Sequence, residues 1–185
     1  PEAEIILVSK DSSIYSRCIL HHYLGNMRTK EELCFAEDDF EDRYKTDWRK
    51  GVTCTGLDDK EKQVFLSDGT SIAYDRLLIA TGSHTLLPAV KGLVGTKGVY
   101  GFHNLAIKKG AVKAEHIVVM GGGLTGLDAA VGFLRLGKKV GLVEMEGHLL
   151  AKQLDARSSG TYEKAMEHEG IVLHLGVGIQ EVCSE

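Results

Sequence analysis

Glycines between residues 121 and 126 have the spacing of a phosphate-binding loop. Gly121, Gly123 and Gly126 follow the order G-x-G-x-x-G directly after an apolar run, Ile117 to Met120. In this order the first glycine permits a tight turn, the second lets a diphosphate approach the backbone, and the third lets the next helix pack closely on the strand. The candidate diphosphate-binding residues are Gly121, Gly122, Gly123, Leu124, Thr125 and Gly126.

An acidic residue follows this loop at the distance that a dinucleotide site requires. Glu144 ends the next apolar run, 18 residues after Gly126. In dinucleotide-binding folds, an acid about 20 residues past the glycines accepts hydrogen bonds from the ribose hydroxyls. Such an acid repels a 2′-phosphate, so the sequence predicts NADH rather than NADPH. The alternative is a glycine turn that binds nothing; strand, loop, helix, strand and acid in register favour the nucleotide site.

The residues around the loop alternate in a pattern that would place it correctly. Apolar periodicity predicts strands at 116–120, 139–144 and 171–175, and helices at 124–136 and 155–168. Asp155 is a candidate cap for the second helix, and Gly170 is its candidate stop. Alternating strands and helices are typical of a parallel sheet with crossover helices, which is a Rossmann-like α/β fold.

The first hundred residues follow a different pattern. A short apolar run, 4–8, predicts a buried strand, and a helix is expected at 12–27. The charged stretch 28–50 is interpreted as helix and loop. Strands are expected at 51–58, 62–67 and 70–75, with Asp68-Gly69 as a hairpin turn, which makes a small antiparallel meander. A buried strand is expected at 76–83, an irregular connector at 84–101 and a helix at 104–115.

Composition excludes several classes of partner. The net charge of −4 contains no long run of either sign, which argues against nucleic acid as a partner. No apolar stretch approaches the ~20 residues of a membrane helix. The four cysteines and eight histidines are scattered, so no metal site is expected. Free thiols suit a reducing cytoplasm.

The longer motifs resemble a known flavoprotein family. "VVMGGGLTGLDAAVGFLRLGKKVGLVE", together with "YDRLLIATGS" at 74–83, resembles the FAD-dependent pyridine nucleotide-disulfide oxidoreductases. "YSRCILHHYLGN" at 15–26 and "LLAKQLDARSSG" at 149–160 are similar to the branch of nitrite reductases, NADH oxidases and rubredoxin reductases. The resemblance implies an FAD domain interrupted by an NAD(H) domain, with hydride passing from nicotinamide to flavin.

The resemblance also implies domain boundaries and a flavin site. Residues 1–103 correspond to a partial FAD-binding domain and residues 104–185 to the NAD(H)-binding domain. In the "IATG" turn, Ala80, Thr81 and Gly82 are candidate FAD contacts, although a plain crossover turn would also explain the glycine. The family's first glycine-rich element and its C-terminal dimerisation domain have no counterpart here. We therefore expect a fragment of a longer, homodimeric enzyme, which by itself could be inactive.

One cysteine is a candidate redox group under the same resemblance. Some members of the family carry a single redox cysteine on the helix after the second strand, and Cys18 matches that position. Arg17, a candidate FAD contact as well, could favour the thiolate. The alternative is a small cysteine that only fills space.

These observations support one leading function and two alternatives. The leading hypothesis is an FAD-dependent NADH oxidoreductase, or a fragment of one, whose electron acceptor is an unknown small redox protein or small molecule. A non-catalytic NAD-binding module is the first alternative. A thiol-dependent NADH oxidase, peroxidase or coenzyme A–disulfide reductase that uses Cys18 is the second.

Overall fold

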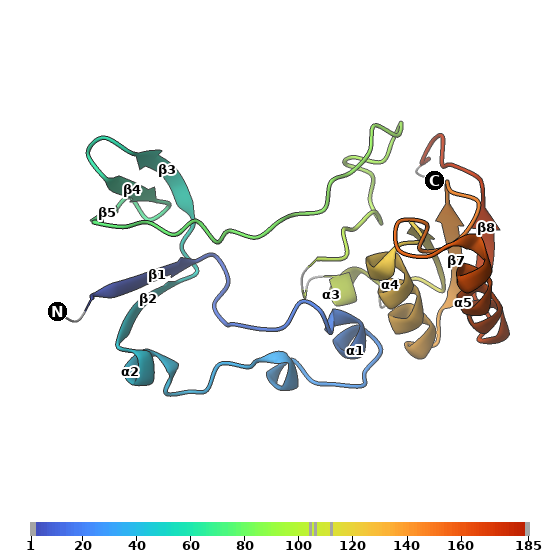
Figure 1. Ribbon diagram of the computed structural model, residues 1–185, viewed down its shortest axis with the longest axis horizontal. Helices are drawn as coiled ribbons and strands as arrows, with labels where there is room; N and C mark the ends of the chain where they lie inside the picture. Colours follow the sequence, from blue (N-terminus) through green and yellow to red (C-terminus); the bar gives the residue numbers. More distant parts are fainter. Residues whose placement is uncertain (1–2, 104, 106, 112, 184–185) are drawn as a thin grey trace. The chain divides into compact units, whose positions relative to one another are not determined.

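The chain forms two compact units in a computed structural model that describes residues 3–103, 105, 107–111 and 113–183 (Figure 1). The first unit comprises Pro1–Ser16 and Cys34–Ser83, and the second comprises Arg17–Leu33 and His84–Glu185. Each unit is built around its own strands. The interpretation of 1–103 and 104–185 as parts of an FAD and an NAD(H) domain remains a prediction.

A three-stranded parallel sheet organises the second unit. Its elements, in chain order, are β6 (His116–Met120), α4 (Leu124–Arg135), β7 (Lys139–Glu144), α5 (Ala156–His168) and β8 (Val172–Leu175). The sheet order is β6-β7-β8, and both strand pairs are parallel. This arrangement confirms the predicted Rossmann-like α/β fold, with bounds within a residue of those expected from the sequence.

Both crossover helices contribute to one core on the same face of this sheet. Leu127, Ala130 and Phe133 of α4 pack in a cluster with Val119 and Leu142 of the strands, and Met166 of α5 lies against it. On the opposite face Val118 and Val172 are exposed. Because alternate residues of a strand point to opposite faces, the buried and exposed positions alternate as the sequence pattern requires.

Shorter helices complete the second unit: α1 (Leu20–Leu24), the 3-10 helix η1 (Glu31–Leu33) and α3 (Ile107–Ala111). The helix expected at 12–27 is therefore much shorter, because Tyr15 lies in extended backbone and forms a bridge with Cys34. The helix expected at 104–115 is limited to α3, and positions 104, 106 and 112 lie outside the described residues.

The helices α1 and α4 contact each other closely through glycine. A Cβ atom on Gly132 would lie 3.0 Å from Leu24 Cδ2 and 3.1 Å from the carbonyl oxygen of His21. A Cβ atom on Gly25 would lie 2.8 Å from Arg135 Cβ. The two helices approach this closely because neither glycine carries a side chain at the contact.

The first unit contains one strand that the sequence did not indicate, β2 (Thr46–Lys50). It pairs in parallel with β1 (Ile5–Ser9), and Ile5 lies opposite Thr46. The interpretation of 28–50 as helix and loop is wrong at its end, although α2 (Phe40–Tyr44) lies within it. Lys45 ends α2 in the left-handed region, and the pairing with β1 then holds this charged stretch extended.

The predicted antiparallel meander is confirmed. β3 (Cys54–Asp58), β4 (Gln63–Leu66) and β5 (Ser71–Ala73) form a sheet in that order. The hairpin between β4 and β5 turns at Asp68-Gly69, where Gly69 has φ +84° and the Asp68 carboxylate accepts a hydrogen bond from the Thr70 amide.

The buried strand expected at 76–83 is wrong in the described structure. The segment is irregular, and Leu78 and Ile79 are 86% and 68% exposed. A strand needs a neighbour to accept and donate its backbone hydrogen bonds, and no described residue pairs with this run.

The connector expected at 84–101 is confirmed as irregular backbone. It contacts the last part of the chain where Lys91 forms a bridge and a 2.7 Å ion pair with Glu181. Gly92 makes this approach possible, since a Cβ atom there would lie 1.9 Å from the Val182 carbonyl oxygen. In the described part of the chain, no helix has both the length and the apolar character needed to cross a membrane.

Candidate nucleotide-binding site

The first and third glycines of the loop are required by its geometry. Gly121 has φ +104°, a conformation that other residues rarely adopt, and its amide donates a 2.8 Å hydrogen bond to Val143 in β7. A Cβ atom on Gly126 would lie 1.8 Å from the Gly121 carbonyl oxygen. The start of α4 can therefore lie against the turn only when position 126 is glycine.

The second glycine borders open space at the beginning of α4. Gly123 is the N-cap residue, and a Cβ atom there would meet no other described atom within 4 Å. No described side chain caps the helix. Its first amide groups have no intrahelical partner, and the helix dipole adds positive potential at this end. Open space beside free amides at a helix N-terminus suits a diphosphate.

The predicted acid lies at the edge of the same loop. Glu144 Oε2 accepts a 2.5 Å hydrogen bond from the Gly122 amide, and Glu144 Oε1 accepts a 2.8 Å hydrogen bond from the Glu146 amide. A carboxylate offers about four acceptor positions, so further donors such as ribose hydroxyls can still bind to it. The structure thus brings the glycine loop and Glu144 together, as the sequence predicts for a dinucleotide site.

Two residues that the sequence analysis did not single out contact the glycine loop. Leu149 and Leu150 lie in the segment between β7 and α5 and are both buried. The Leu150 amide donates a 2.9 Å hydrogen bond to the Gly122 carbonyl, and a Cβ atom on Gly122 would lie 2.7 Å from Leu149 Cδ2. The available signal was a pair of adjacent leucines in the connection between β7 and α5.

The residues predicted to contact flavin belong to different units. Ala80, Thr81 and Gly82 are exposed in the first unit, and Gly82 has φ +67°. In the second unit, Arg17 donates a 2.7 Å hydrogen bond to the His103 carbonyl, and Cys18 is an exposed free thiol. The flavin-site assignments therefore remain predictions.

A histidine of α1 faces the second turn of α4. His21 Nδ1 lies 3.7 Å from Asp128 Oδ2, and the two side chains are 17% and 46% exposed. Partial burial, with smaller contributions from His21 and Arg28, lowers the pKa of His22. His21 and Asp128 can therefore form an ion pair when the imidazole is protonated.

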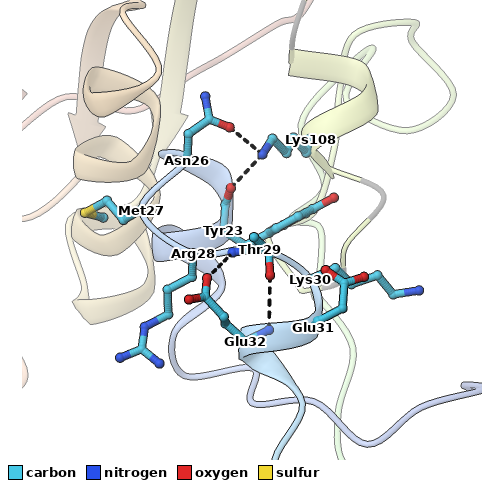
Figure 2. Close-up of a pocket in the computed structure, with 9 residues that line it drawn as sticks. All are labelled: Tyr23, Asn26, Met27, Arg28, Thr29, Lys30, Glu31, Glu32 and Lys108. Carbon is cyan, nitrogen blue, oxygen red and sulfur yellow. Dashed lines mark hydrogen bonds between the residues drawn. The ribbon is translucent and has the colours of Figure 1, made fainter.

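A separate hollow of about 400 Å³ lies beside α1 and α3 in the second unit (Figure 2). Lys108 Nζ donates hydrogen bonds to the Asn26 side chain, at 2.6 Å, and to the Tyr23 carbonyl, at 2.9 Å. Thr29 and Glu32 exchange backbone-to-side-chain hydrogen bonds in the manner of a capping box. These polar groups bind one another, so the hollow is stabilised without a ligand.

Comparison with known proteins places the chain in a family. Residues 1–185 match the family described as pyridine nucleotide-disulphide oxidoreductase. The chain belongs to this family. The match agrees with the resemblance seen in the glycine loop, the acid after it and the "IATG" turn.

Curated members of the pyridine nucleotide-disulphide oxidoreductase family are longer than this chain. It is 28% identical over 175 residues to the assimilatory nitrate reductase electron transfer subunit of Bacillus subtilis, covering 92% of this chain and 23% of that protein. It is 30% identical over 173 residues to the nitric oxide reductase FlRd-NAD(+) reductase of Aliivibrio fischeri, covering 91% and 45%. The chain thus spans less than half of each relative.

A solved structure confirms the fold. The water-forming NADH oxidase from Lactobacillus brevis, bound to NADH, superposes with a TM-score of 0.86 at 21% identity, covering 100% of this chain and 43% of that one. At this level of identity the similarity establishes the fold class alone.

Proposed function

We propose that this chain is the NADH-binding part of an FAD-dependent oxidoreductase that passes hydride from NADH to flavin and on to a further acceptor. The hydrogen bond between Glu144 and the Gly122 amide carries the proposal. It joins the predicted ribose acceptor to the predicted diphosphate loop, and the two residues are 22 positions apart in the sequence, which supports the proposal. Membership of the pyridine nucleotide-disulphide oxidoreductase family supports the same function.

In this proposal the protein's own groups bind and orient the nucleotide. The free amides at the start of α4 bind the diphosphate in the open space beside Gly123. Glu144 accepts hydrogen bonds from the adenosine ribose hydroxyls, and its charge repels the 2′-phosphate of NADPH. Bound NADH is therefore favoured over bound NADPH.

The flavin assignment is supported by sequence motifs and by accessible backbone. The segment at Ala80, Thr81 and Gly82 is exposed and so accessible to a ligand, and the left-handed φ of Gly82 favours glycine. When bound, FAD would supply the group that accepts the hydride from NADH.

The whole protein needs an acceptor for the electrons. A small redox protein or a small molecule fits the family, since named relatives include rubredoxin-NAD(+) reductase of Alcanivorax borkumensis. We also propose that the full-length protein is a homodimer and acts in the cytoplasm, where its thiols stay reduced; the four cysteines are thiols rather than disulfides in the described structure.

Isothermal titration with NADH tests the nucleotide site. The wild-type chain should bind NADH, and Gly123→Trp should abolish binding because an indole would occupy the open space beside the loop amides, where a Cβ atom meets no described atom within 4 Å beyond its chain neighbours. Gly160→Trp on α5 is the matched control, since its Cβ position is equally open and lies outside the loop. Wild-type-like NADH affinity in Gly123→Trp would defeat the assignment.

Flavin absorption separates the enzyme from a non-catalytic module. Purified full-length protein should be yellow or become yellow when reconstituted with FAD. Colourless protein that binds NADH but cannot be reconstituted would instead support an NAD-binding module.

The exposure of Cys18 favours a second candidate, a thiol-dependent NADH oxidase, peroxidase or coenzyme A–disulfide reductase. Replacing Cys18 by serine in the full-length protein should then destroy turnover while NADH binding is unchanged. Undiminished turnover in Cys18→Ser would rule this candidate out and leave the flavin route alone.

A further inference from the structure

We propose that Ser159 and Glu163 of α5 are positioning residues for the nucleotide diphosphate, and that they act through the segment Leu149–Leu150. The inference rests on the proposed NADH site. Neither residue lies in the glycine loop, and both approach it through hydrogen bonds to the peptide of Leu149.

The segment is attached to the glycine loop by its own backbone and side chain. The Leu150 amide donates a 2.9 Å hydrogen bond to the carbonyl of Gly122. The amide of the same glycine binds Glu144. The Leu149 side chain occupies the space where a Cβ atom on Gly122 would lie. A shift of Leu149–Leu150 would therefore move the Gly122 peptide at the mouth of the proposed diphosphate site.

The same segment is attached to α5 through the amide and the carbonyl of Leu149. Glu163 Oε1 accepts a 3.0 Å hydrogen bond from the Leu149 amide, and Ser159 Oγ lies 2.7 Å from the Leu149 carbonyl oxygen and 2.8 Å from Glu163 Oε1. Ser159 and Glu163 are four residues apart, so they lie on the same face of the helix. Together they fix the position of the Leu149 backbone.

Ser159 is buried, as expected for a side chain that holds the Leu149 backbone in place. Of the described residues it is the one polar side chain that is buried, with 0% exposure. A buried hydroxyl must be hydrogen-bonded, and its single proton can be donated to either the Leu149 carbonyl or Glu163. Both acceptors belong to the same small network, so either choice holds the segment against α5.

The backbone of Leu150 shows why the segment needs external support. Its φ is +54°, in the left-handed region that a branched residue adopts rarely. Such a conformation persists when the surrounding contacts determine it. Here those contacts come from Gly122 on one side and from α5 on the other, so the helix sets where the Leu150 amide points.

The test compares nucleotide binding by Ser159→Ala, Glu163→Ala and Glu163→Gln in the full chain. Losing one hydrogen bond that positions the loop should weaken both NADH and ADP by about three- to tenfold, because both ligands carry the diphosphate. Glu163→Gln should keep near-wild-type affinity, since its amide oxygen still accepts the Leu149 and Ser159 hydrogen bonds. Glu167→Ala, an exposed position on the same helix, is the matched control.

Hydrogen–deuterium exchange supplies a readout of the loop itself. Amides of residues 118–127 should exchange faster in Ser159→Ala and Glu163→Ala than in Glu167→Ala, at matched thermal stability. Glu163 is half-buried, so its alanine variant keeps the test available if Ser159→Ala folds poorly. A loss in Glu163→Gln as large as in Glu163→Ala would overturn the hydrogen-bond explanation.

The two proposals fail in different ways. Wild-type protein that does not bind NADH would overturn the nucleotide site and this inference with it. Wild-type protein that binds NADH, with unchanged affinity and unchanged exchange in both alanine variants, would overturn this inference alone.

Discussion

The side chain of Glu144 and the backbone amide of Gly122 are joined by a 2.5 Å hydrogen bond. The bond connects the carboxyl ends of β6 and β7, which are neighbours in the parallel sheet. In open α/β sheets, ligands bind in the crevice beyond the carboxyl ends of the strands. The same carboxylate thus binds the glycine loop and, in the proposed site, would provide acceptors for a ribose.

Replacing Glu144 should change both affinity and nucleotide preference. Glu144→Ala removes the ribose acceptor and the partner of the Gly122 amide, so NADH affinity should fall about 10- to 100-fold, as for hydrogen bonds to a charged group. NADPH affinity should fall much less, because the repulsion of its 2′-phosphate is also removed. Titration of both nucleotides measures the ratio. Glu146→Ala is the control, and an unchanged NADH-to-NADPH ratio in Glu144→Ala would contradict the role of this acid.

Alanine at two glycines of the loop should separate folding from binding. Gly126→Ala should destabilise the protein by more than about 2 kcal/mol, because its Cβ would lie 1.8 Å from the Gly121 carbonyl. Gly123→Ala should lower NADH affinity with little effect on stability, since its φ of −80° suits alanine and its surroundings are open. Urea denaturation and titration give the two quantities. Equal stability losses in both variants would show that the loop geometry is described wrongly.

The contact between α1 and α4 can be tested with a pair of helical glycines. Gly132→Ala should lower the free energy of unfolding by about 1 kcal/mol or more, because the added methyl would meet backbone atoms of His21 within 3.4 Å. Gly160→Ala on α5 should raise it by about 0.5–1 kcal/mol, because its surroundings are open and alanine favours helix. Stabilisation by both substitutions would mean that α1 does not pack on α4.

The helix cap of α5 should make stability depend on pH. Hydrogen bonds from the backbone and side chain of Ser158 lower the pKa of Asp155, whose carboxylate accepts the Ser158 amide at 2.8 Å. Because the folded pKa is depressed, this stabilisation is present above the ordinary aspartate pKa of about 4 and is lost as pH falls through the folded value.

Thermal unfolding of Asp155→Ala measures this effect. Its melting temperature should lie several degrees below that of the wild type at neutral pH, and the gap should close at acidic pH. Asp155→Asn should retain most of the stability at neutral pH, since asparagine also caps helices well. A gap that stays constant down to acidic pH would show that the ionised carboxylate is not the source.

The sequence by itself determined the parallel sheet of the second unit and its glycine loop. Gly121 and Gly126 are dictated by local backbone geometry. The hairpin at Asp68-Gly69 and the cap at Asp155 were predictable because they depend on residues two or three positions apart. Glu144 was predictable because the parallel pairing of β6 with β7 brings the end of one strand beside the end of the other.

Only the tertiary structure decided the features that depend on distant partners. β2 is a strand because β1 lies beside it, although its charged sequence has no strand signal. The apolar run at 76–83 is irregular because no described residue pairs with it. The coupling of Ser159 and Glu163 to Gly122 through Leu149 also arises only on folding. Backbone pairing and side-chain contact between remote residues leave no periodicity in the sequence, and for that reason the sequence could not reveal them.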